Sequence, residues 1–143
     1  MKPTRDEILN ATPAQLREWV AVDVMKLSNV RKAEGGEYMA RFDFADEGDL
    51  IYDTGNVVGW DTAYVPNYPE DIAAAWPIIE KLEIDPRVIL TDVTRASETG
   101  TYEGLKWNVR MRAIETHGYW NASAETVPLA ICRAALLAML EKE

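Results

Sequence analysis

The chain has 143 residues, of which 48% are hydrophobic and 27% are charged, a balance typical of a globular domain with a core and unlike that of a disordered segment. Its 15 Lys and Arg stand against 24 Asp and Glu, giving a formal net charge of −9; this disfavours a general nucleic-acid or anionic-membrane binder, because both need a positive field. The single cysteine excludes an intramolecular disulfide, and one cysteine with one histidine is too few ligands for a structural zinc site.

Two helices are predicted at the start of the chain. The first is short, from Thr4 to Asn10, and the second begins at Thr12-Pro13, where threonine is a favourable N-cap and proline suits the first helical position. Apolar residues then recur with a helical period, and the second helix is expected to end near Leu27. The predicted apolar stripe consists of Leu16, Trp19, Val20, Val24 and Leu27.

A first hairpin is predicted after these helices. Residues 38–44 follow the alternation of a half-buried strand, residues 46–49 form a turn, and residues 50–52 form a short returning strand. The acidic residues of this region do not have the spacing of an EF-hand loop, so no metal site is expected. Residues 53–68 are predicted as a long loop that either covers the core or forms a site.

A central helix and a second hairpin come next. The helix is expected to begin at Pro69, to bend at Pro77 and to end at Asp85-Pro86. The hairpin joins residues 87–95 to residues 105–114, and its second strand has the clearest alternation in the chain. One face of that strand carries Leu105, Trp107, Val109, Met111 and Ala113, and the other carries Lys106, Asn108, Arg110 and Arg112.

The last predicted element is a helix from Ser123 to Leu140. Arg133 is the only charged residue between Thr126 and Glu141. A helix that is apolar on nearly all sides is buried on nearly all sides, and this one is too short to cross a membrane comfortably. It is therefore either central to the fold or half of a subunit interface, and the second possibility predicts a homo-oligomer.

These elements predict an α+β fold in one domain, residues 1–143. Their order is helix, hairpin, helix, hairpin, helix, and hairpins need only local connections. The economical arrangement is one antiparallel sheet of about four strands with helices packed on it. Because the first residues lack the apolar segment of a signal peptide, a cytoplasmic protein is expected.

Two blocks of sequence resemble a known family. They are PNYPEDIAAAW, residues 66–76, and ASAETVPLAICRAAL, residues 122–136. Both are similar to the phage alpha-beta-alpha sandwich domain of bacteriophage and prophage proteins. The resemblance implies that fold, a phage origin and the cytoplasm of a bacterial host. Because the family has no established activity, the resemblance assigns no catalytic residues.

A cationic strand face is the first candidate site. Lys106, Arg110 and Arg112 lie on one face of the strand 105–114 in an otherwise acidic chain. Guanidinium groups are good donors to phosphate and carboxylate, so this face is a candidate site for an anion such as a nucleotide. The alternative is that these residues pair with acids on neighbouring strands, as is common on an exposed sheet.

Aromatic residues and one buried arginine complete the candidate site. Trp60 and Trp120 are predicted in loops beside turns. There they either stack on a planar ligand, together with Tyr64, Tyr68 and Tyr119, or cover the core. Arg133 must find a carboxylate, such as Glu125 or Glu80, backbone carbonyls or a ligand, because burying an unpaired guanidinium costs several kcal/mol.

Motifs for catalysis are scarce in the sequence. It has no P-loop, no dinucleotide-binding glycine pattern and no nucleophile elbow, and no cofactor is expected. His117 is the only histidine, so a small enzyme would have to use it with a nearby carboxylate such as Glu115 or Glu125. Cys132 is expected to be inert, because it lies in the apolar last helix.

The sequence therefore favours binding over catalysis. We expect a phage accessory protein, homo-oligomeric through its last helix, that binds a host protein or a small anionic, nucleotide-like ligand. The expected binding residues are Lys106, Arg110, Arg112, Trp120, Tyr119, His117, Arg133, Trp60 and Tyr68. Neither a membrane nor a nucleic acid is expected as a partner. The alternative is the small enzyme built on His117.

Overall fold

The structure, a computed structural model, describes residues 3–35, 37–38, 44–54, 62–95, 107–115 and 118–142. Its helices are α1 (Arg5–Leu9), α2 (Pro13–Trp19), the π-helix η1 (Val20–Val24), α3 (Ile72–Ile84) and α5 (Val127–Lys142). Its strands are β1 (Ser28–Lys32), β2 (Glu37–Tyr38), β3 (Phe44–Ala45), β4 (Leu50–Asp53), β5 (Thr62–Tyr64), β6 (Val88–Arg95), β7 (Trp107–Ala113) and β8 (Tyr119–Ala124).

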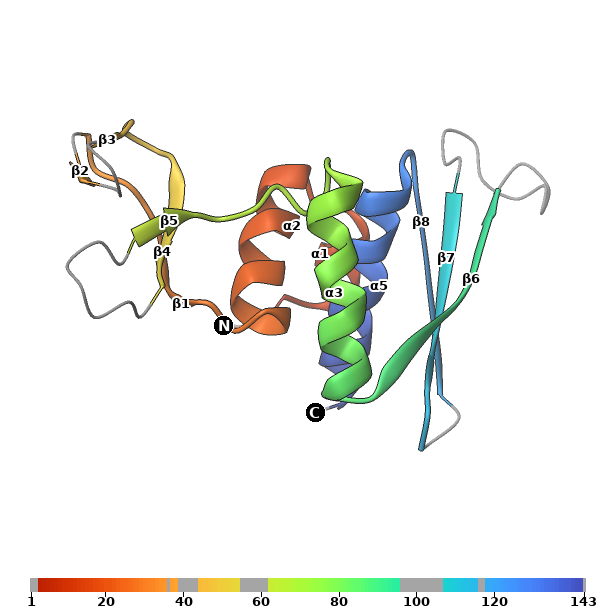
Figure 1. The fold of residues 1–143 in the computed structure, drawn as a ribbon. Coiled ribbons are helices and arrows are strands. Elements are labelled where there is room, and N and C mark those ends of the chain that lie inside the picture. The colour runs from red at the N-terminus through yellow and green to blue at the C-terminus, as the bar shows by residue number, and fades with distance from the viewer. Residues whose placement is uncertain are drawn as a thin grey trace.

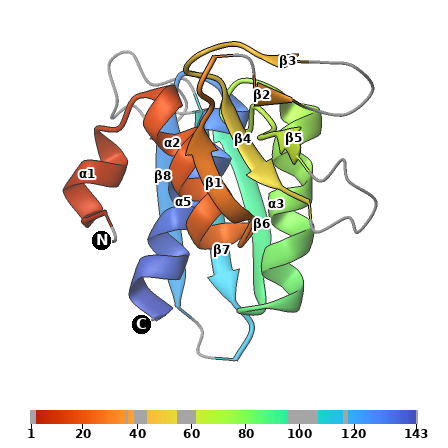
Figure 2. The same ribbon diagram turned by 90° about the vertical axis from the view of Figure 1, so that its left-hand side faces the viewer.

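The helices form a layer between two antiparallel sheets (Figure 1). The first sheet has the strand order β1-β4-β5, the second has the order β6-β7-β8, and β2 and β3 form a separate two-stranded ribbon. Figure 2, viewed from the side of the first sheet, shows β1 and β4 in front of the helices. The chain thus mixes helices with antiparallel sheets, as the sequence predicts.

The predicted single sheet of about four strands is wrong, because the structure has two three-stranded sheets and three of their strands were not predicted. β1 lies where the second helix was predicted to end, β5 lies in the predicted long loop, and β8 lies in a stretch predicted as loop and helix start. Their sequences SNVRK, TAY and YWNASA hold few of the bulky alternating residues that mark a strand. The hairpin between residues 38–44 and 50–52 is also wrong, since β4 pairs with β1 and β5.

The N-terminal helices begin where their caps place them. Thr12 and Gln15 form a reciprocal capping box, in which each side chain accepts from the backbone N–H of the other at 3.3 and 3.0 Å. Pro13 occupies the first helical position. The helix then widens into η1, where the N–H of Met25 donates to the carbonyl of Val20 at 2.9 Å, five residues back as in a π-turn. Lys26 follows with a positive φ of 56° and ends it.

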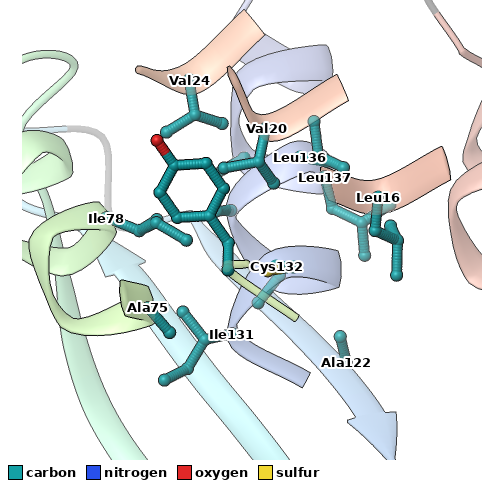
Figure 3. Packing of buried hydrophobic residues seen from close by; sticks show 14 of the residues in the cluster. Leu16, Val20, Val24, Ala75, Ile78, Ala122, Ile131, Cys132, Leu136 and Leu137 are labelled. Carbon is teal, nitrogen blue, oxygen red and sulfur yellow. The ribbon is translucent and has the colours of Figure 1, made fainter. Parts of the chain in front are cut away.

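Helix α5 is the centre of the fold. It packs against α1, α2, η1 and α3 on one side and against β7 and β8 on the other, and Figure 3 shows its side chains among those of the neighbouring elements. Its buried residues are Ala130, Ile131, Cys132, Ala134, Ala135, Leu136, Leu137 and Ala138. Of the two predicted roles, α5 therefore has the central one, and most of its apolar surface is covered by its own chain.

A smaller cluster packs on the first sheet. It consists of Ala33, Ala45 and Ile51, which are separate from the main core. The main core includes Leu50 and Val65 from the same part of the chain, so the two sides of β4 contribute to different clusters. Within the part of the chain that the structure describes, no helix is both long and apolar enough to cross a bilayer.

Because α5 is enclosed, shortening one of its buried side chains should leave a cavity. Leu137→Ala, at a site with no exposed surface, is expected to lower the free energy of unfolding by about 2–5 kcal/mol. Ile84→Ala, at a residue of α3 that is 77% exposed, should change it by less than about 0.5 kcal/mol. Urea denaturation followed by circular dichroism measures both, and equal effects would contradict this account of the core.

Candidate functional site

The structure divides the predicted binding residues among several places. Arg110, Arg112 and Tyr119 lie on one face of the second sheet, Trp120 lies on the other, Arg133 is on α5, and Tyr68 is in the core. Lys106, His117 and Trp60 lie outside the described residues. The predicted set is therefore not one site.

The second sheet has a polar face turned away from the helices, here called the outer face. Directly paired residues of antiparallel strands point to the same side, and side chains alternate along each strand. The helices α3 and α5 pack on the opposite side, where Val109 and Met111 are buried (Figure 1). The registers place three rows on the outer face: Ile89, Arg112 and Tyr119; Asp92, Arg110 and Asn121; Thr94, Asn108 and Ser123.

Arg110 is held against an aromatic ring on the outer face. Its guanidinium carbon lies 4.2 Å from the centroid of the Tyr119 ring, a distance suited to a cation–π contact. Both side chains are exposed, so the contact orients the guanidinium without withdrawing it from solvent. One face of the Tyr119 ring is therefore already occupied by this arginine.

The two outer-face arginines lack acidic partners among the described residues. The ion pairs that the structure gives there are Arg5–Glu141, Arg31–Asp53 and Arg87–Glu115. Asp92 stands opposite Arg110 in the register, yet it forms no ion pair with that residue in this part of the chain. The buried Nε of Arg112 has no hydrogen-bond partner there either. The alternative of pairing with neighbouring acids is thus not realised among the described residues.

The outer face also holds polar residues that the sequence analysis did not select. Asn108 donates from Nδ2 to Oγ of Ser123 at 2.9 Å and to the carbonyl of Ala122 at 3.4 Å, and Asn121 is exposed beside Arg110. The alternation in residues 107–113 already places Asn108 with the arginines. Asn121 and Ser123 were missed because β8 was not recognised as a strand.

Trp120 belongs to the inner side of the sheet. It lies on β8 and not in a loop, opposite Met111, so it faces the helices. Its indole Nε1 donates to Oε2 of Glu141 on α5 at 2.7 Å. The predicted grouping of Trp120 with the basic strand face is therefore wrong, because adjacent residues of a strand point to opposite sides.

Arg133 takes backbone carbonyls as partners. Its guanidinium donates to the carbonyl of Ser123 at 2.9 Å and to that of Ala11 at 3.4 Å. Burial lowers the pKa of Arg133, and the charge of Glu125 acts in the opposite direction. These bonds connect α5 to β8 and to the segment between α1 and α2, so the residue has a structural role.

Tyr68 and Cys132 are both in the core. Tyr68 is 2% exposed, and burial raises the pKa of its hydroxyl to about 12. Cys132 has no exposed surface, and burial raises the pKa of its thiol far above the ordinary value, which matches the expectation of an inert cysteine. Neither side chain is available to stack on or react with a ligand from solvent.

The described part of the chain lacks a cluster of potential metal ligands. Over the described ranges, no three His, Cys, Asp or Glu side chains gather closely enough to hold a metal ion. The exposed acids near the first sheet, Glu34, Asp46 and Glu47, thus do not form such a group.

Comparison with known proteins identifies related folds. The family model described as "Phage ABA sandwich domain" matches residues 18–136. A crystal structure of a phage protein from Bacillus cereus superposes with a TM-score of 0.51 at 22% identity, covering 89% of this chain and 92% of that one; at this identity the likeness concerns the fold alone. No curated protein matches the chain.

The buried Tyr68 makes stability depend on pH in the alkaline range. Its folded pKa of about 12 lies above the unfolded value of about 10, so the unfolded chain loses the proton first. The contribution of this residue is complete below about pH 10 and is lost as the pH rises towards 12. The urea concentration at which half of the protein is unfolded, measured at pH 8, 10 and 11, should fall more steeply with pH for the native protein than for Tyr68→Phe.

A matched control tests whether this slope belongs to the buried phenol. Tyr119→Phe removes a hydroxyl from an exposed ring, 48% accessible, and should keep the slope of the native protein. Identical slopes for Tyr68→Phe and Tyr119→Phe would show that Tyr68 does not carry the effect.

Proposed function

The chain belongs to the phage ABA sandwich domain family, and from this premise we propose that it acts by binding an acidic partner protein on the outer face of its second sheet. One observation carries the proposal: Arg110 and Arg112 lie on this face, and neither is paired with a carboxylate of the described residues. An unpaired guanidinium is a strong donor to a carboxylate, which it can hold through two parallel hydrogen bonds.

The composition of the outer face supports a protein partner. Arginine and tyrosine are enriched in protein interfaces, where they often supply much of the binding energy. Arg110 and Tyr119 are both exposed and already in contact. Asn108, Asn121 and Ser123 add amide and hydroxyl groups around them. An open sheet face of this kind offers a broad contact surface, whereas small-molecule sites are usually concave.

The spacing of the arginines indicates the form of the partner segment. Residues 110 and 112 are two positions apart on β7, which corresponds to about 7 Å along a strand. Acidic side chains at every second position of an extended segment have the same spacing. The best complement is therefore an extended segment with alternating carboxylates.

The net charge of −9 also influences the direction from which the partner approaches. An acidic partner is repelled by most of an acidic surface and attracted where the exposed Arg110 and the half-buried Arg112 lie side by side. The partner should therefore approach the second sheet with its acidic side first. This supports specificity and association rate more than affinity.

The predicted homo-oligomer becomes a special case of this proposal. Assembly through α5 no longer has support, because other elements of the same chain cover most of that helix. A second copy could instead present Glu34, Asp46 and Glu47, which are exposed near the first sheet, at the opposite end of the molecule from the outer face (Figure 1). Light scattering at increasing protein concentration, with and without added salt, measures such self-association.

An alternating peptide tests the docking surface directly. In an NMR titration of the labelled protein, (Glu-Thr)4 should shift amide signals of β7 and β8, and its affinity should fall as salt is raised. A peptide of the same composition with paired glutamates, (Glu-Glu-Thr-Thr)2, should bind more weakly. Arg110→Gln with Arg112→Gln should lower the affinity for (Glu-Thr)4 by about tenfold or more.

The control removes the same charge elsewhere. Lys26→Gln with Lys32→Gln, two exposed positions outside the second sheet, should leave the peptide affinity within about twofold. If both double variants lost peptide affinity equally, the interaction would depend on net charge alone and the outer face would not be its site. Shifts caused by ATP but not by either peptide would replace the protein partner with a small anionic ligand.

A further inference from the structure

A pocket lies on the inner side of the second sheet, beside the C-terminal part of α5. Its volume is about 300 Å³, at the lower end of the range of small-molecule sites. Val88 and Ala113 from the sheet and Ala138 from α5 supply apolar walls, and Trp120 adds an aromatic one. The pocket is on the opposite side of the sheet from the outer face, so the two do not share a surface.

Trp120 is fixed in place as a wall of this pocket. Its hydrogen bond to Glu141, 2.7 Å long, joins β8 to α5, and the indole is partly exposed. A fixed indole attracts a cation to its face, more strongly than the other aromatic side chains do. Where the face of this ring borders the pocket, it favours a positively charged group.

Two carboxylates line the same pocket, those of Glu115 and Glu141. Glu115 pairs with Arg87 at 3.3 Å and Glu141 with Arg5 at 3.5 Å. All four side chains are at least half exposed, and such ion pairs contribute little to stability. A carboxylate accepts several hydrogen bonds at once, so either glutamate can take another cationic donor.

We propose that this pocket binds a small organic amine. The apolar or aromatic body of the ligand lies against Val88, Ala113 and Ala138, and its ammonium group is directed to Trp120 and the two glutamates. The ligand is thus opposite in charge to the partner of the outer face. The proposal does not depend on that partner, because different residues carry it.

Three probes of matched shape test the charge of the ligand. They are phenethylamine, neutral 2-phenylethanol and the anion phenylacetate, and each contains one phenyl ring. The readout is the NMR signal of the Trp120 indole N–H, assigned through its loss in Trp120→Phe, with the other tryptophans as internal references. Phenethylamine should give a saturable shift in the millimolar range, phenylethanol a weaker one, and phenylacetate none.

Isosteric variants locate the ammonium group. Glu115→Gln and Glu141→Gln should each weaken phenethylamine binding by about two- to fivefold, while Glu34→Gln, exposed near the first sheet, should leave it unchanged. Arg110→Gln with Arg112→Gln should also leave it unchanged, which separates this site from the outer face.

Several results would overturn the proposal. If all three probes shifted the indole signal equally, the pocket would bind the phenyl ring without regard to the charge of the ligand. Unaltered affinity in both glutamine variants would show that the carboxylates take no part. The absence of a saturable shift at tens of millimolar phenethylamine would remove the site. Because Glu115 and Glu141 are exposed, their variants should fold even if Trp120→Phe does not.

Discussion

A helix of sixteen residues that is apolar around its circumference is stable in water only when other parts of the chain cover it on every side. In this protein α1, α2, η1 and α3 surround α5 together with the strands β7 and β8. Arg133 is accommodated within this packing through the carbonyls of Ser123 and Ala11. The positions of the second sheet and of the N-terminal helices thus follow from the need to enclose one helix.

This enclosure also explains which parts of the fold the sequence predicts well. The start of α2 depends on Thr12 and Pro13, the burial of α5 depends on its composition, and the two faces of β7 depend on strict alternation. All three signals are local in the sequence, and the structure has all three of the features that they predict. The cationic face could therefore be located from Arg110 and Arg112 before any tertiary contact was known.

The missed elements depend on contacts between distant residues. β8 has Ala122 and Ala124 on its inner side, and small side chains give a weak strand pattern although they allow α5 to pack closely against the strand. The partners of Arg133 include the carbonyl of Ala11, 122 positions away. The pocket beside Trp120 likewise combines β6, β7, β8 and α5. The periodicity of a short segment carries no information on contacts between residues that are distant in the sequence.

Tyr119 and Trp120 are neighbours in sequence but serve opposite sides of the second sheet, one beside Arg110 and the other beside Glu141. The division depends entirely on the register of β8 against β7, in which Tyr119 stands opposite Arg112 and Trp120 opposite Met111. A slip of one residue would exchange the two aromatic rings and bring Asn121 under α5. An insertion or deletion of one residue within β8 itself would therefore move the residues beyond it to the opposite faces and alter both surfaces at once, whereas the connection between the two strands can change in length with less effect.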